Sequence, residues 1–232
     1  LSIQDVNKSF GAKRVHQGVD LDLKSGEILA LFGGSGTGKS VILRSLIGLE
    51  KPDAGKIMFE GRDITKLNED QLIDVRKKIG YVFQNGALFD SMSVEENLAY
   101  PLREHTKLSE VEIRERIEEM LNLIGLKGTE KLLPASLSGG MQKRVGAARA
   151  IILRPKVILY DEPTAGLDPF NTHRLLDLMK RIQERNPDNA AIFVTHDIPA
   201  AFQVANRVAI LYNGKIHTID TTENIQKSKD PF

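Results

Sequence analysis

The stretch Gly33-Gly34-Ser35-Gly36-Thr37-Gly38-Lys39-Ser40 holds the residues of this chain that are best suited to chemistry. It matches the pattern G-x-x-x-x-G-K-[ST], in which a glycine-rich backbone turns sharply and directs successive N–H groups at phosphate oxygens. Lys39 would meet the outer phosphates as a point charge, and the Ser40 hydroxyl would ligate Mg²⁺. The pattern therefore predicts a nucleoside triphosphate site and leaves its purpose open.

Two neighbouring segments can position this loop. Residues 28–32 form a short apolar run that is typical of a buried strand, and residues 41–47 have the composition of a helix. A helix that begins directly after the loop adds its N-terminal dipole to the anion site. We expect strand, loop and helix in this order, and an ordinary glycine-rich turn is the alternative.

Two acidic residues, Asp161 and Glu162, follow a second apolar run at residues 157–160. If both runs are parallel strands of one sheet, their carboxyl ends meet at the same edge. Asp161 then fits a ligand of Mg²⁺ or of its water shell, and Glu162 could polarise a water for in-line attack on a γ-phosphate. Without the phosphate loop, a simple helix cap would explain the acidic pair equally well.

A third motif, Ser138-Gly139-Gly140, opens a helix expected at residues 142–153. Its hydroxyl and glycine amides form a second anion-binding cradle. One phosphate loop does not need two cradles, but a head-to-tail dimer does. Each nucleotide could then be held by the loop of one copy and closed by the Ser-Gly-Gly of the other. The sequence thus predicts a homodimer with nucleotide at its interface.

Composition narrows the class of protein. The chain has 232 residues, of which 41% are hydrophobic and 27% charged, as in globular proteins. The net charge of +1 gives no electrostatic reason to expect nucleic acid. The absence of cysteine excludes disulfides and thiolate metal sites. Because we find neither a membrane-spanning apolar run nor an export signal, we expect the chain to act in the cytoplasm.

The remaining pattern predicts a parallel sheet covered on both faces. Two half-exposed strands and a hairpin come first, and a helical block opens with capping boxes at Ser93 and Ser109. Later strands alternate with helices and end in a hairpin whose turn is Asn213-Gly214. The expected strands are 2–10, 19–23, 27–32, 56–59, 79–83, 157–160, 190–194, 208–212 and 215–219, and the expected helices include 69–78, 142–153, 169–185 and a short one near 200.

Taken together, the motifs resemble those of the nucleotide-binding subunit of an ABC transporter. They are Gly33–Ser40, Gln84, Leu137–Met141, Val157–Glu162, Ala165–Asp168 and His196, in this order and spacing. The resemblance covers essentially the whole chain and implies one α/β domain, 1–232, of the P-loop NTPase class and ABC ATPase type. It would have a RecA-like parallel-sheet core with an antiparallel β subdomain (1–85 and 155–232) and an inserted helical subdomain (about 86–154).

The resemblance also implies roles for single residues, with ATP and Mg²⁺ as cofactors. Phe10 would stack on adenine, Val41 would join the phosphate loop in binding ATP, and Asp168 would cross the dimer interface. Gln84 would contact Mg²⁺ and report its state to the membrane subunit, and His196 would contact the γ-phosphate and orient water. For Phe10 a core position is the alternative, and for His196 a structural role. The implied catalytic set is Glu162, His196 and Gln84, and the implied metal set is Ser40, Gln84 and Asp161.

A narrower resemblance lies in residues 83–89 and 97–106, and in Met141 where most of the family carries Gln. These features are similar to the ATPase of the Mla phospholipid systems, which serve MCE-domain lipid carriers. The similarity implies a subunit that powers phospholipid transport from the cytoplasmic face of a bacterial inner membrane. Its partners would be integral-membrane permease subunits, an MCE-domain lipid-binding protein and a small STAS-type subunit, with no nucleic acid.

Other functions stay open at this point. An ABC ATPase for a small solute or a lipoprotein would use identical chemistry. A soluble ABC ATPase that acts on DNA or ribosomes usually carries a zinc module, a long coiled coil or a second ATPase, and none is found in this sequence. A P-loop kinase is disfavoured by the Ser138-Gly139-Gly140 motif and by Glu162 as a base.

Overall fold

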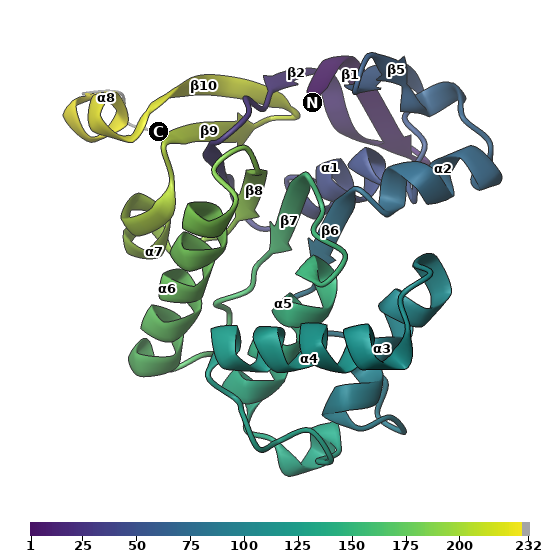
Figure 1. Ribbon diagram of the computed structural model, residues 1–232. Coiled ribbons are helices and arrows are strands. Elements are labelled where there is room, and N and C mark those ends of the chain that lie inside the picture. The colour runs from purple at the N-terminus through teal and green to yellow at the C-terminus, as the bar shows by residue number, and fades with distance from the viewer. Residues whose placement is uncertain (229–232) are drawn as a thin grey trace.

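A mainly parallel six-stranded sheet forms the centre of the computed structural model, which describes residues 1–228 (Figure 1). The strands stand in the order β10-β9-β3-β8-β7-β6, and β10 turns back along β9. Because β6, β7, β8, β3 and β9 run parallel, their carboxyl ends share one edge of the sheet. The strands are β3 (Ile28–Phe32), β6 (Ile79–Val82), β7 (Val157–Asp161), β8 (Ala190–Val194), β9 (Arg207–Tyr212) and β10 (Lys215–Thr221).

A smaller antiparallel sheet has the order β2-β1-β4-β5. Its strands are β1 (Ser2–Phe10), β2 (Lys13–Asp22), β4 (Ala54–Phe59) and β5 (Arg62–Asp63). The strand predicted at 19–23 begins earlier, at Lys13. Its pairing with β1 shifts register three times, so the alternation of apolar and polar residues that reveals a strand in a sequence is interrupted there.

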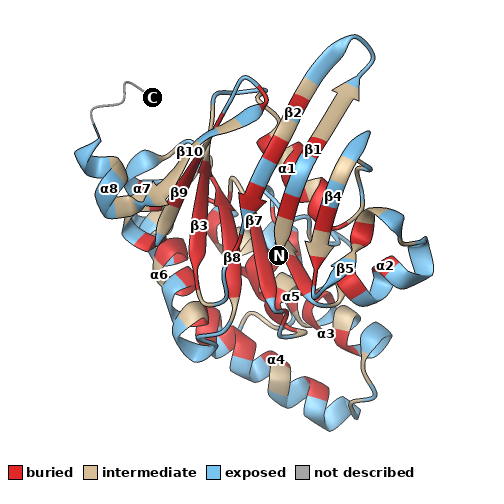
Figure 2. Cartoon of the chain, turned by 90° about the horizontal axis from the view of Figure 1, so that it is seen from above, coloured by how far each residue is buried: buried red, intermediate tan, exposed pale blue. Residues whose placement is uncertain are grey.

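The parallel sheet is covered on both faces, as predicted. Side chains of β3 alternate between two hydrophobic clusters, with Ile28 and Ala30 on one face and Leu29 and Leu31 on the other. Figure 2 shows β3, β7 and β8 buried over most of their length. One face packs on α5 (Gly139–Ile151), α6 (Pro169–Arg185) and α7 (Ile198–Val204). The other packs on α1 (Lys39–Leu46), α2 (Glu69–Arg76) and the antiparallel sheet.

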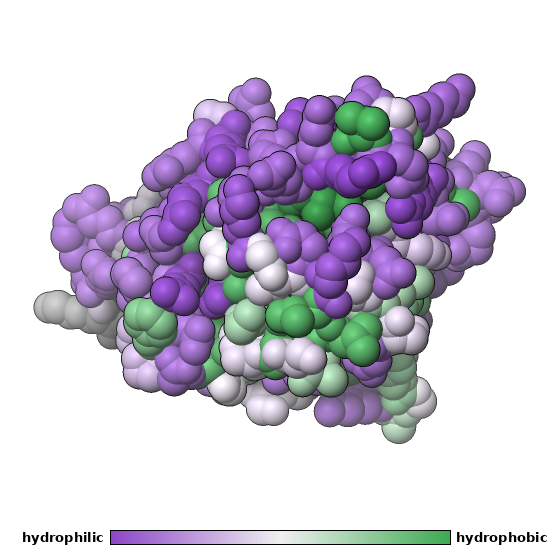
Figure 3. All heavy atoms as spheres, turned by 60° about the horizontal axis from the view of Figure 1, so that its bottom comes forward, coloured by the Kyte–Doolittle hydropathy of each residue, from purple (hydrophilic) through white to green (hydrophobic). Residues whose placement is uncertain are grey.

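The helical block comprises α3 (Val94–His105) and α4 (Glu110–Ile124), which lead into α5. Both predicted capping boxes form, at Ser93 and at Ser109. Its buried side chains belong to the same cluster as one face of the parallel sheet, so the block shares a core with the sheet. At the end of the molecule that this block forms, hydrophobic side chains lie in patches between hydrophilic ones (Figure 3).

Three further details concern the predicted elements. Helix α5 begins at Gly139, three residues before the predicted start, because the Ser138 hydroxyl accepts a hydrogen bond from the Met141 N–H at 3.3 Å. The Asn213-Gly214 turn is confirmed, with positive φ at both residues. The sequence did not predict the short helix α8 (Thr222–Lys227). Among residues 1–228, no helix combines the length and apolar character that crossing a bilayer requires.

Candidate functional site

A cavity of about 450 Å³ opens where β3 ends and α1 begins. The phosphate-loop segment and α1 contribute the largest share of its lining, the antiparallel sheet contributes one wall, and the loops after β7 and β8 contribute two polar side chains. The lining residues are Phe10, Lys13, Val15, Gly33, Ser35, Gly36, Gly38, Lys39, Ser40, Val41, Glu162 and His196. The structure therefore brings most of the predicted site residues together around one space.

Gly38 shows why the loop requires glycine. It is the N-cap of α1 with a φ of 103°, and no side chain caps the helix there. A Cβ at this position would lie 2.4 Å from Val15 Cγ1 and 2.6 Å from His16 Nε2, so strand β2 presses directly against the loop. The first N–H groups of α1 are thus left for a ligand, and the helix N-terminus favours an anionic one.

Lys39 is almost fully buried, and its ammonium is held inside the loop. Nζ donates to the carbonyl oxygens of Gly33 at 2.7 Å and Gly34 at 3.1 Å. The Thr37 hydroxyl also donates to the Gly34 carbonyl, at 2.9 Å, and fixes the turn. A phosphate oxygen carries negative charge and is a stronger acceptor than either carbonyl, so the ammonium is placed to bind one.

Ser40 and Asp161 form the oxygen-rich part of the site. The Ser40 hydroxyl donates to Asp161 Oδ1 at 2.8 Å, and the Tyr81 hydroxyl donates to Asp161 Oδ2 at 2.8 Å. Burial, together with the nearby Asp161 charge, raises the pKa of Tyr81, so this phenol stays a neutral donor. A hydroxyl beside a carboxylate suits Mg²⁺, which prefers oxygen ligands. The residues present therefore fit a magnesium ion shared with nucleotide phosphates.

Glu162 and His196 lie side by side at the ends of β7 and β8. His196 Nδ1 is 2.8 Å from Glu162 Oε2, and the Glu162 N–H donates to the Val194 carbonyl at 3.0 Å. Glu162 has a φ of 49°, a conformation that costs a residue other than glycine about 1–3 kcal/mol. The carboxylate is largely buried while the imidazole is exposed, so the pair offers a positioned base and a solvent-facing polar partner.

Phe10 ends β1 at the mouth of the cavity. Its side chain is 45% exposed, which contradicts the alternative that it is a core residue. The Lys8 ammonium lies 4.9 Å from the ring centroid. An exposed aromatic face at the entrance of a phosphate-binding cavity is suited to stacking on a flat base.

The predicted signature residues, Asp168 and Gln84 do not line this cavity. Ser138, Gly139 and Gly140 begin α5, and Asp168 caps α6. A Cβ on Gly140 would lie 2.5 Å from Asn171 Oδ1, and the Asn171 side chain donates to Asp168, so the signature and Asp168 are neighbours. Hydrogen bonds from Asn171 lower the pKa of Asp168.

Gln84 is exposed in the loop after β6 and does not line the cavity. The signature and Asp168 make up the part of the predicted machinery that does not line the cavity of its own phosphate loop. The Ser-Gly-Gly cradle is therefore available to a ligand held elsewhere, as the sequence prediction of a shared site requires.

Sequence reasoning missed two supporting residues. The sequence predicts a buried strand at Tyr81 and no role for this residue, although a hydroxyl in an otherwise apolar strand next to β7 is a usable signal. Lys143 of α5 donates to the carbonyls of Pro163, at 3.1 Å, and of Ala165, and so holds the loop that follows Glu162. Burial lowers the pKa of Lys143. Nothing in the sequence linked it to that loop.

Comparison with known families decides the assignment. The family model described as "ABC transporter" matches residues 16–165 of this chain, a span that runs from β2 through the phosphate loop to the loop after Glu162. The chain belongs to the ABC transporter family. It is an ATPase cassette of that family, and the site described above fits ATP with Mg²⁺ as cofactors.

Relatives with this cassette carry different substrate names. The chain is 43% identical over its whole length to a "probable ribonucleotide transport ATP-binding protein" of Mycobacterium leprae, of which it spans 66%. It is 37% identical to the "intermembrane phospholipid transport system ATP-binding protein MlaF" of Haemophilus influenzae, covering 99% of this chain and 87% of that one. The chain thus spans about two thirds of the length of the first relative.

A solved ABC cassette has the same fold. The ATP-binding cassette MJ0796, in a dimeric post-hydrolysis state bound to ADP and Pi, superposes with a TM-score of 0.86 at 32% identity, over 95% of this chain and 97% of that one. The predicted fold class, a P-loop ABC ATPase, is confirmed by this likeness and by the family match.

Proposed function

We propose that this ABC cassette powers phospholipid transport across or from a bacterial inner membrane, through a partner permease to which it binds on the cytoplasmic side. The observation that supports ATP binding and hydrolysis is one cavity that combines Lys39 and Ser40 with Glu162 and His196. Support for phospholipid comes from the residues that resemble the Mla systems and from the likeness to the Haemophilus influenzae protein over 99% of this chain.

In the proposed reaction, loop amides and Lys39 bind the phosphates, and Phe10 stacks on adenine. Ser40, Asp161 and Gln84 would hold Mg²⁺, which when bound neutralises charge on the phosphates. Glu162 accepts the proton of the attacking water, and His196 orients that water against the γ-phosphate. Tyr81 keeps the Asp161 carboxylate in place through its 2.8 Å hydrogen bond.

The site is proposed to be complete only in a homodimer. The phosphate loop and Glu162 line one cavity, whereas Ser138–Gly140 and Asp168 lie together elsewhere on the same chain. A second copy placed head to tail would bring its Ser-Gly-Gly cradle to this cavity and its Asp168 to the interface. ATP would then close the dimer, and hydrolysis would reopen it.

A groove of about 340 Å³ between α2, the end of β6, α3 and the end of α5 is the proposed permease contact. Tyr81, Phe83, Phe89 and Tyr100 line it, and the last three are each more than 40% exposed. Phe89 and Tyr100 meet edge to face at 5.3 Å. Asn97 holds Phe89 in place: its buried side-chain amide accepts a hydrogen bond from the Phe89 N–H and donates one to the Phe89 carbonyl. Exposed aromatic anchors of this kind suit a short amphipathic helix from a membrane subunit.

Purification of the complex from its own membrane tests this proposal. The bound subunits and co-purifying lipids would be identified by mass spectrometry. A permease, an MCE-domain protein and a STAS-type subunit with phospholipid are expected, whereas a periplasmic solute receptor would indicate a small-solute transporter instead. As a matched pair, Tyr100→Ala should lose the permease, and Val111→Ala, which alters an exposed residue of α4, should keep it.

A further inference from the structure

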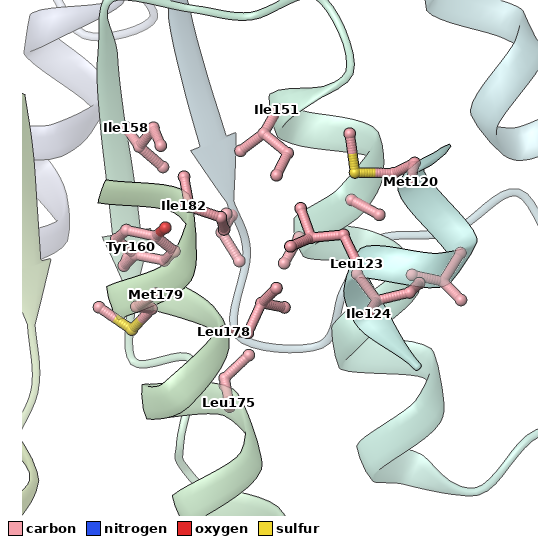
Figure 4. Packing of buried hydrophobic residues seen from close by; sticks show 14 of the residues in the cluster. Met120, Leu123, Ile124, Ile151, Ile158, Tyr160, Leu175, Leu178, Met179 and Ile182 are labelled. Atoms are coloured by element: carbon pink, nitrogen blue, oxygen red, sulfur yellow. The ribbon is translucent and has the colours of Figure 1, made fainter. Parts of the chain in front are cut away.

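A second cavity, of about 370 Å³, lies between α4, the end of α5 and the end of α6. Its apolar lining comes from Met120 and Leu123 of α4, Ile151 of α5 and Ile182 of α6, whose side chains Figure 4 shows as parts of one packed cluster. It shares no lining residue with the nucleotide cavity or with the aromatic groove. This space therefore has no part in the function proposed above.

The rim of this cavity is strongly basic. Arg116 of α4, Arg154 after α5 and Arg185 at the end of α6 surround one acidic residue, Glu119. Their guanidinium nitrogens lie 3.9, 3.5 and 3.4 Å from its carboxylate oxygens. Three positive charges thus face one negative charge, and the amides of Asn186 and Asn189 complete the rim.

Hydrogen-bond donors outnumber acceptors at this rim. Each guanidinium offers five N–H donors. Within residues 1–228, the side chains of these three arginines donate one hydrogen bond with good geometry. It runs from Arg185 Nη1 to Glu119 Oε1 at 3.4 Å. The Arg154 and Arg185 side chains are 60% and 50% exposed, so their remaining donors face solvent and are open to an anion with several acceptor oxygens, which would also balance the charge.

Arg116 is the most enclosed of the three arginines, with a side chain 22% exposed. Burial lowers the pKa of Arg116, the neighbouring Arg154 charge lowers it further, and the Glu119 charge only partly offsets both effects. The positive charge of Arg116 is therefore held in unfavourable surroundings, and a bound anion would relieve this repulsion.

We propose that this cavity binds a phosphate monoester whose phosphate is held by Arg116, Arg154 and Arg185 and whose short apolar part lies on Met120 and Leu123. Planar guanidinium groups match phosphate oxygens in pairs, and the mixed lining suits a small anionic amphiphile. Such a ligand would tie α4 of the helical block to α6. Its source could be a free metabolite or a lipid headgroup, which share this chemistry.

Titration calorimetry at constant ionic strength tests the site, with butyl phosphate and monomeric dihexanoyl phosphatidic acid as probes. The Lys39→Ala chain is used as background, because the phosphate loop also attracts phosphate. Both probes should bind in that background. Arg116→Gln should weaken binding about tenfold, the size expected for a charged hydrogen bond. Arg114→Gln, on the exposed face of the same helix, should leave it unchanged.

Glu119→Gln tests the direction of the change in affinity: removing the competing carboxylate should tighten the binding of both probes. Arg185→Gln replaces Arg116→Gln as the diagnostic variant if the latter lowers the melting temperature. Tighter binding of the lipid than of butyl phosphate would identify a membrane source, and equal binding a soluble one. The proposal is overturned if neither probe binds, if the arginine variants bind as the background does, or if Glu119→Gln weakens binding.

Discussion

Replacing Gly38 by alanine should destabilise the phosphate loop far more than the same change at Gly36. Gly38 has a φ of 103°, which strains any other residue by about 1–3 kcal/mol. The new Cβ would also lie 2.4 Å from Val15 Cγ1 and 2.6 Å from His16 Nε2. Val15 is β-branched and His16 is buried, so neither can move freely, and overpacking adds about 1–3 kcal/mol. Gly36, with a φ of 73° and open space around its Cβ, should pay only strain of about 1–2 kcal/mol.

The assay is thermal unfolding followed by circular dichroism without nucleotide. At about 2–4 °C per kcal/mol for a chain of this size, Gly38→Ala should lower the melting temperature by roughly 10 °C and Gly36→Ala by roughly 4 °C. Equal melting temperatures for the two variants would refute the close packing of β2 against the loop. A larger effect at Gly36 would refute it as well.

Three further predictions concern named side chains. Lys39→Ala should weaken ATP binding about tenfold or more by equilibrium dialysis, because it removes a charged phosphate contact, and unchanged affinity would contradict that role. Glu162→Gln should lower steady-state turnover about 100-fold or more while nucleotide stays bound, and steady turnover would exclude Glu162 as the base. Burial lowers the pKa of His16 from 6.5, so the unfolded chain takes up the proton first, and the stability contributed by neutral His16 should be lost as pH falls below 6.5. His16→Gln should therefore show a smaller drop in melting temperature between pH 7.5 and 5 than the parent chain, and equal drops would argue against a buried neutral imidazole.

Much of the fold could be predicted because its signals are local. The capping boxes at Ser93 and Ser109 and the Asn213-Gly214 turn each fix an element through neighbours within four residues, and all three form as expected. The start of β2 was predicted wrongly because the signal for it is not local. Bulges in its pairing with β1 break the alternation on which strand prediction depends.

The candidate site also has a part that the sequence predicts and a part that it does not. The phosphate loop and the residues after β7 and β8 could be placed because parallel strands end at one edge. The hydrogen bonds of Tyr81 to Asp161 and of Lys143 to the Pro163 carbonyl could not, because they join residues 80 and 20 positions apart through tertiary packing. The arginine rim around Glu119 is likewise assembled from three helices or their ends, and no local pattern marks it.

ATP hydrolysis is proposed to need a nucleotide site shared between two copies of the chain, and mixing two inactive variants tests this directly. Lys39→Ala damages the phosphate loop, and Ser138→Arg blocks the signature. In a mixed dimer, the loop of the Ser138→Arg copy meets the signature of the Lys39→Ala copy, so one of two sites is intact. After equal mixing, with mixed dimers verified by two affinity tags, ATPase activity should recover to about a quarter of the parent value, because half of the dimers are mixed. Mixed dimers that form but hydrolyse no more ATP than either variant alone would contradict a shared site.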